Sequence, residues 1–236
     1  MNTLISLELK KNKIQTYLLA SLIITITMLG FLFLFAYAPM LEPDDKDMAI
    51  FSGYNNLIPL FAVFNMAVFA VLSAVMYAKF VIEDYSGKRP ILLFSYPVRR
   101  KKMILAKLSA VSGFTIVAMT LSNFIIYLIF GSTEKFIHLV GEDFTFLIML
   151  KVVEYTLVMA VIASSIGIIA VGLGWIKKSV PTTIVSAVLL ASLMCNIVVN
   201  ATLSRVTMYA LAIVMVTIGL LVSIILIKKV TVMEVD

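Results

Sequence analysis

The sequence predicts an all-α membrane protein, a polytopic bundle of about six transmembrane helices with both termini on the cytoplasmic side. Composition is the first observation behind this prediction: of 236 residues, 62% are hydrophobic and 14% are charged, and the mean hydropathy is +1.09. Soluble domains are roughly 45–50% apolar and about 25% charged, and they cannot bury so much apolar surface. The other two observations are six long apolar segments and an uneven distribution of lysine and arginine.

Six segments reach the roughly 20 apolar residues that a helix needs to cross a bilayer. They cover residues 14–38, 57–82, 105–130, 144–173, 181–200 and 206–227. The turn Asn200–Arg205 is short, so the last two spans form a hairpin. Before the first span, residues 2–13 could form an interfacial helix, although Glu8 interrupts its apolar residues. No remaining segment is long enough for a soluble domain, so residues 1–236 are expected to form a single membrane domain.

Lysine and arginine predict the orientation, because cytoplasmic loops are enriched in both. With the N-terminus inside, the inner segments hold 15 of the 19 basic residues. The first outer segment is acidic instead, with Glu42, Asp44, Asp45 and Asp47. The net charge of +6 is therefore interpreted as membrane topology and contact with anionic lipid, with no role in binding nucleic acid.

The cytoplasmic segment 83–104, between the second and third spans, carries the strongest functional signal. Pro90 favours the start of a short helix, because the N–H that proline lacks would be unpaired at a first helical position. Residues 91–94 (Ile-Leu-Leu-Phe) are too few to span a membrane and too apolar for a solvated loop. Pro97 starts the next helix, whose first turn is basic. A rigid apolar element at the membrane surface predicts a docking site for another protein, and the alternative is a re-entrant loop that faces lipid.

This segment resembles the loop after the second span in permease subunits of type-2 ABC exporters. Members commonly show a Glu, a Gly, an apolar run, Ser-x-Pro, an Arg and a later Lys. The matching positions here are Glu83, Gly87, Leu92, Leu93, Phe94, Ser95, Pro97, Arg99 or Arg100, and Lys107. The resemblance implies that Gly87–Ser95, including Pro90, forms a coupling helix that docks on a separate ABC ATP-binding subunit.

The resemblance also implies partners, location and branch. Two permeases would pair as a dimer, either two copies of this chain or this chain with a homologous permease, in a bacterial plasma membrane. Larger members carry a longer outer element between the fifth and sixth spans, for which Asn200–Arg205 is too short. The chain therefore resembles the compact branch that is linked to bacteriocin, lantibiotic or peptide export and immunity.

Several enzyme motifs are absent from the sequence. There is no Gly-x-x-x-x-Gly-Lys-Ser/Thr segment, so any ATP hydrolysis is expected in a separate subunit. Neither His-Glu-x-x-His nor Gly-x-Ser-x-Gly occurs, and His138 is the only histidine. Cys195 is the only cysteine, and no Cys/His cluster suggests a metal. We therefore expect no catalytic residues, metal or cofactor in this chain.

Polar residues within the apolar segments are candidates for an intramembrane pathway. Lys151 and Glu154, three residues apart in the fourth span, can pair on one helix face, and charges within a span invite a functional interpretation. The alternative is that Lys151 extends to the outer interface. Asn65, Asn123 and Asn196 could line a pathway or form hydrogen bonds between helices.

The sequence thus predicts the membrane permease of an ATP-driven exporter for an amphipathic peptide or a lipophilic antibiotic. One alternative is a secondary carrier or channel without an ATPase, which would require intramembrane ion sites and repeated halves. Apart from Glu154, the spans contain no central acidic residue, and no internal repeat is evident. The other alternative is a non-transporting immunity or assembly factor.

Overall fold

The computed structural model describes residues 2–41, 51, 53–86, 99–137, 140, 144–202 and 204–232. Its helices are α1 (Asn2–Lys11), α2 (Ile14–Leu41), α3 (Tyr54–Tyr77), the π-helical turn η2 (Ala78–Ile82), α5 (Arg100–Ile137), α6 (Phe146–Lys177), α7 (Val180–Ala201) and α8 (Arg205–Val232). None of the described residues is in a β-strand. Six helices, with η2 as the continuation of α3, are long and apolar enough to cross a membrane. The predicted all-α fold class is confirmed.

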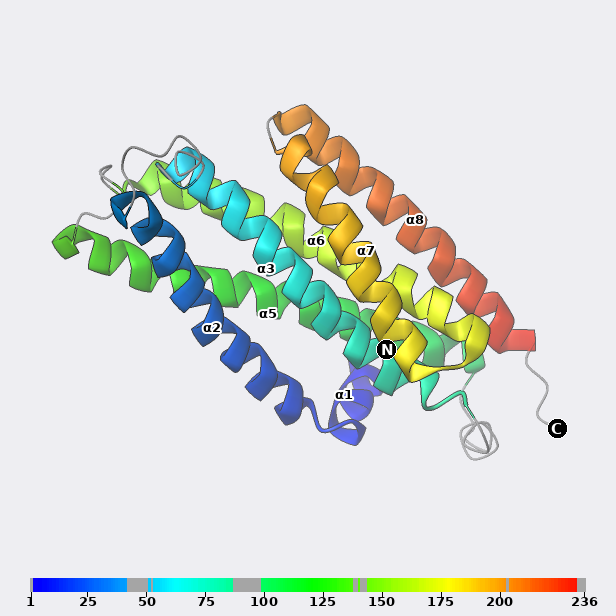
Figure 1. The fold of residues 1–236 in the computed structure, drawn as a ribbon. Coiled ribbons are helices and arrows are strands. Elements are labelled where there is room, and N and C mark those ends of the chain that lie inside the picture. Colours follow the sequence, from blue (N-terminus) through cyan, green and yellow to red (C-terminus); the bar gives the residue numbers. More distant parts are fainter. Residues whose placement is uncertain are drawn as a thin grey trace.

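The central helices of the bundle are α3 and α6. Their most apolar stretches are each 61% buried, against 11% in α2 and 17% in α8. In Figure 1 they run between α2 and α5 on one side and α7 and α8 on the other. The outward faces of α2 and α8 remain apolar, with Leu19, Ile23, Ile213 and Leu220 all exposed. Such surfaces suit contact with hydrocarbon, because lipid covers apolar side chains that water would not.

Small residues allow the close packing of α6 against its neighbours. A Cβ atom added at Gly167 would overlap the Ser73 side chain of α3. A Cβ at Gly174 would likewise overlap Thr183 of α7. Close backbone approach at small residues is the usual way in which membrane helices pack, because lipid provides no hydrophobic drive for their association.

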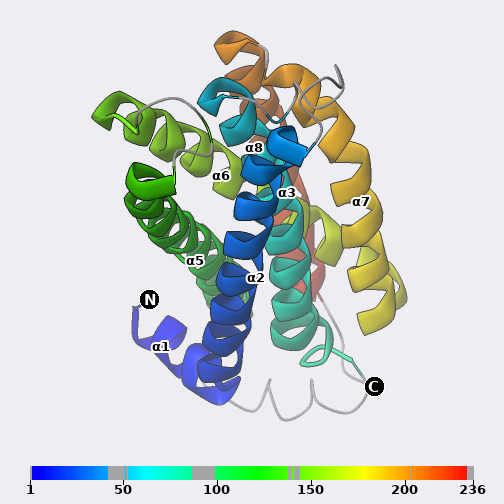
Figure 2. The ribbon, with the colours of Figure 1, turned by 60° about the vertical axis from the view of Figure 1, so that its left-hand side comes forward.

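The short helix α1 lies at one end of the bundle, next to the ends of α2 and α5 (Figures 1 and 2). Ser86, the last described residue after η2, and Arg99, the residue before α5, belong to the same end, which we call the α1 end. Here η2 widens the last helical turn, and the Glu83 N–H donates to the Ala78 carbonyl at 3.0 Å, five residues back. Turns of this kind occur often at functional sites.

Candidate functional site

Four charged side chains meet at the α1 end, and we call Glu8, Lys11, Asp84 and Lys107 the charge cluster. Lys107 of α5 is fully buried. Its Nζ donates to Glu8 Oε2 of α1 at 2.8 Å and to Asp84 Oδ2, in the turn after η2. Lys11 Nζ donates to the same Asp84 oxygen at 2.6 Å. Two positive and two negative charges therefore balance, which offsets the high cost of burying a lone ammonium group.

The charge cluster also changes the acidity of Asp84. Burial by itself would raise the pKa of this carboxyl, because low-dielectric surroundings disfavour its charged form. The charges and hydrogen bonds of Lys107 and Lys11 outweigh that effect, so the pKa of Asp84 is lowered from its ordinary value of 3.8. The ion pairs therefore stabilise the fold wherever Asp84 is ionised.

This shift predicts how the contribution of Asp84 depends on pH. Because its folded-state pKa is depressed, the stabilisation is fully present above 3.8 and is lost as the pH falls through the lower folded-state value. In thermal unfolding of the detergent-solubilised protein, the wild type should therefore have a clearly higher melting temperature than Asp84→Asn at neutral pH. Below pH 3.8 the difference between the two melting temperatures should narrow. A gap that stays constant for as long as both proteins remain folded would contradict the ion-pair assignment.

The charge cluster and its neighbours fix both ends of the segment 87–98. On the entry side, the Tyr85 ring packs against Trp175 of α6 with ring centroids 5.3 Å apart, and both side chains are buried. On the exit side, the Arg99 carbonyl accepts the N–H groups of Lys102 at 2.8 Å and Met103 at 3.2 Å, which begins α5. The described residues on either side of this segment are thus attached to α1, α5 and α6 at the α1 end.

Most of the predicted docking residues lie outside the described part of the chain. These are Gly87, Pro90, Leu92, Leu93, Phe94, Ser95 and Pro97. Among the others, Glu83 pairs with Lys79 of its own helix at 2.8 Å, and Arg99 is exposed while Arg100 is partly buried. The coupling helix therefore stays a prediction.

Sequence reasoning missed the roles of Glu8, Lys11 and Asp84 in the charge cluster. It assigned Glu83 to the family pattern, whereas the adjacent Asp84 is the residue that contacts Lys107. It also treated Glu8 as an interruption of an apolar helix, whereas Glu8 is a partner of Lys107. One signal was present: Lys107 follows an apolar stretch within a helix, and a lysine buried there requires carboxylate partners.

A second polar group lies in the interior of the bundle. Asn65 Nδ2 of α3 donates to Asn123 Oδ1 of α5, and Asn123 Nδ2 donates to Thr156 Oγ1 of α6 at 2.9 Å. All three residues are buried. The predicted polar residues Asn65 and Asn123 are therefore brought together. Asn196 is not part of this group, because it lies on the exposed face of α7.

Lys151 and Glu154 lie at the opposite end of the bundle and have different partners. Lys151 Nζ donates to Asn55 Oδ1 of α3 at 2.9 Å. Glu154 accepts a hydrogen bond from the Tyr209 hydroxyl at 2.8 Å and lies 3.5 Å from the Arg205 guanidinium. Among the described contacts, Lys151 and Glu154 therefore do not pair with each other. Lys151 connects α6 to α3, and Glu154 connects α6 to α8.

Comparison with known proteins adds the decisive observation. Residues 4–193, from α1 into α7, match the family model described as "ABC-2 family transporter protein". The chain belongs to this family. An ABC-2 permease is a membrane transport component, and it normally works with a separate ATP-binding subunit. This permease is also similar to a Bacillus subtilis (strain 168) protein named "Uncharacterized protein YcbO", with 31% identity over 193 residues, 82% of this chain and 83% of the relative. No solved structure matches it.

Proposed function

We propose that this ABC-2 permease is the membrane subunit of an exporter that moves an amphipathic peptide or a lipophilic antibiotic out of the cell. Residues 87–95 dock on the ATP-binding subunit at the cytoplasmic side. The observation that carries the proposal is the charge cluster, because it attaches Asp84, just before this segment, to α1 and α5 of an ABC-2 family bundle. A segment with rigid ends can transmit movement, whereas a loop with free ends would absorb it.

The charge cluster indicates how movement passes into the bundle. A displacement of the docking segment acts on Asp84 and, through Lys107, on α5. Through Glu8 and Lys11 it acts on α1 as well. The hydrogen bonds of Asn123 to Asn65 and Thr156 then join α5 to α3 and α6. ATP-driven closure of the partner subunits therefore tilts these helices together between inward-facing and outward-facing states.

The translocation route in this proposal lies between two bundles. The interior between α3, α5 and α6 is filled by packed side chains such as Met66, Met119 and Met159, all buried. Over the helices that the structure describes, a single bundle therefore provides a wall and leaves no enclosed path. A second copy, or a homologous permease, completes the route.

The docking assignment is tested by co-purification with the ATP-binding subunit from mild detergent. Phe94→Asp places a charge in the apolar docking segment and should abolish recovery of the ATP-binding subunit while membrane insertion is retained, because an unpaired carboxylate in an apolar interface is strongly unfavourable. Leu92→Asp should do the same. Phe136→Asp is the matched control, because Phe136 is 86% exposed at the opposite end of α5. If Phe94→Asp recovers as much ATP-binding subunit as Phe136→Asp, the docking assignment is wrong.

A further inference from the structure

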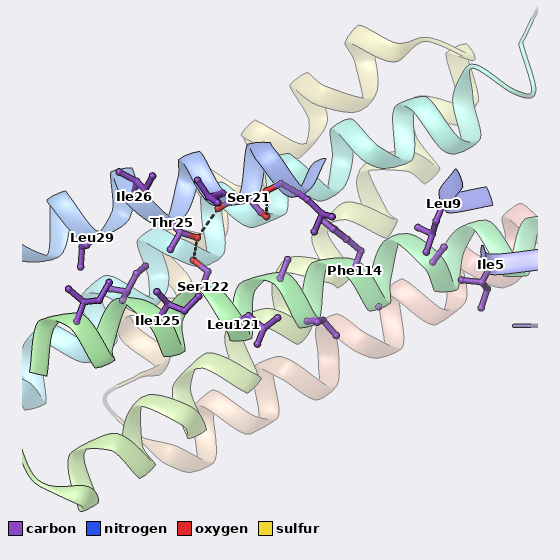
Figure 3. A pocket seen from close by; sticks show the side chains of 18 of the residues that line it. Ile5, Leu9, Ser21, Thr25, Ile26, Leu29, Phe114, Leu121, Ser122 and Ile125 are labelled. Atoms are coloured by element: carbon purple, nitrogen blue, oxygen red, sulfur yellow. Dashed lines mark hydrogen bonds between the residues drawn. The ribbon is translucent and has the colours of Figure 1, made fainter. Parts of the chain in front are cut away.

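A groove with a volume of about 830 Å³ runs between α2 and α5. Figure 3 shows its lining, with Thr25 of α2 facing Ser122 of α5. Ile5 and Leu9 of α1 line the groove at the α1 end. In Figures 1 and 2, α1 lies next to the ends of α2 and α5, and its Ile5 and Leu9 form part of the groove wall there.

The groove is lined mainly by apolar side chains, with a few uncharged hydroxyl groups. None of the described residues that line the groove is charged. The lining hydroxyls have partners within the protein: Ser21 donates to the Leu18 carbonyl at 2.8 Å and Ser109 to the Ala106 carbonyl at 3.1 Å. Thr25 Oγ1 lies 2.8 Å from Ser122 Oγ. A polar ligand would lose its own hydrogen bonds to water without replacement, so the groove selects an apolar chain.

The α2 wall of the groove has the length and position of one leaflet of a bilayer, whereas the lining on α5 runs farther, from Ser109 to Ile129. Along α2 the lining extends from Leu18 to Leu29. This distance is roughly 16 Å at 1.5 Å per residue, about half of a ~30 Å hydrocarbon core. Because α2 spans Ile14–Leu41, the groove runs from the α1 end to the middle of the helix. An acyl chain from the leaflet on the α1 side has this extent.

Exposed lysines lie on the elements that form the α1 end of the groove. Lys10 is exposed in the last turn of α1, next to the lining residue Leu9, and Lys13 is exposed in the turn to α2. Lys102 is exposed in the first turn of α5, two helical turns before the lining residue Ser109 and on the same helix face. These lysines are separate from the charge cluster, so their charge is available to an anionic headgroup.

We propose that the groove binds one acyl chain of an anionic phospholipid from the leaflet on the α1 side, with its headgroup at Lys10, Lys13 and Lys102. A membrane-spanning helix of a second copy is the alternative occupant, but α1, whose Ile5 and Leu9 line the end of the groove, would stand in its way. α1 supplies both Leu9 to the groove and Glu8 to the charge cluster. Bound lipid therefore stabilises α1, whose Glu8 pairs with Lys107 of α5. This lipid site is independent of the proposed cargo.

Photo-crosslinking of the full chain in bilayers tests the proposal. The probe is phosphatidylglycerol with a diazirine in its acyl chain, and adducts are mapped by mass spectrometry. Gly113→Phe fills the groove, because a Cβ at this exposed lining position meets no atom within 4 Å. It should lower labelling of the α2 and α5 lining about tenfold, as expected for a blocked apolar site. Gly30→Phe is the matched control, because a Cβ on Gly30 also meets no atom within 4 Å and Gly30 lies outside the groove. If Gly113→Phe aggregates, Gly113→Val takes its place.

The headgroup assignment needs a second arm with phosphatidylcholine carrying the same diazirine chain. Wild type should prefer the phosphatidylglycerol probe, and the combined Lys10→Gln, Lys13→Gln and Lys102→Gln variant should lose that preference while its lining is still labelled. Equal labelling of Gly113→Phe and Gly30→Phe would overturn the proposal. Equal labelling of wild type by the two probes would also overturn it, as would crosslinks between two chains through α2 and α5 with no lipid adduct.

Discussion

Replacing Lys107 with methionine is expected to lower the free energy of unfolding by about 3–5 kcal/mol, the cost of removing one partner from a buried ion pair. Methionine keeps the length of the side chain but leaves Glu8 and Asp84 without their buried cation. Reversible unfolding in mixed micelles measures the change. Lys101→Met is the matched control, because Lys101 is exposed in the first turn of the same helix.

A double-mutant cycle separates the ion pair from general effects of losing a lysine. Lys107→Met combined with Asp84→Asn should destabilise the protein by clearly less than the sum of the two single changes, because the second change removes a carboxylate that the first left unpaired. Lys107→Met should also lower the recovery of the ATP-binding subunit in co-purification. Should Lys107→Met prove no more destabilising than Lys101→Met, the charge cluster does not hold the α1 end together.

The second large effect is expected from Asn123→Leu in the bundle interior. Asn123 bonds both Asn65 and Thr156, and hydrogen bonds between membrane helices are worth about 0.6 kcal/mol each, with a maximum near 1.7. Losing both should lower the free energy of unfolding by about 1–3 kcal/mol. Thr156→Val removes one of the two bonds and should cost less. Asn196→Leu should have little effect, because Asn196 lies on the exposed face of α7.

The same variants distinguish the two roles considered for the buried asparagines. If Asn65 and Asn123 hold helices together, stability and transport should fall in parallel across Thr156→Val and Asn123→Leu. If they line a cargo route, transport should fall while the free energy of unfolding stays at the wild-type value. The burial of both residues and their mutual hydrogen bond favour the first outcome.

The sequence by itself predicted the six membrane helices, because a bilayer requires long apolar segments whose backbone hydrogen bonds are satisfied within each segment. It also led to the type-2 ABC permease family through the 83–107 segment, and the family match over residues 4–193 confirms that assignment. Both results depend on local patterns, which are legible without knowing how the helices pack. Cytoplasmic orientation and the coupling helix come from the same kind of pattern and stay predictions.

Only the tertiary structure decided which polar side chains meet. Glu83 and Asp84 are adjacent acidic residues, and the path of the backbone through η2 and the turn after it determines which of them contacts Lys107. Glu8 lies 99 residues from Lys107 along the chain, and Asn65 lies 58 residues from Asn123. Sequence spacing within α6 allowed Lys151 and Glu154 to pair, yet neighbouring helices offer each a different partner. Contacts between distant helices depend on how each helix is rotated and packed, and no local pattern encodes that.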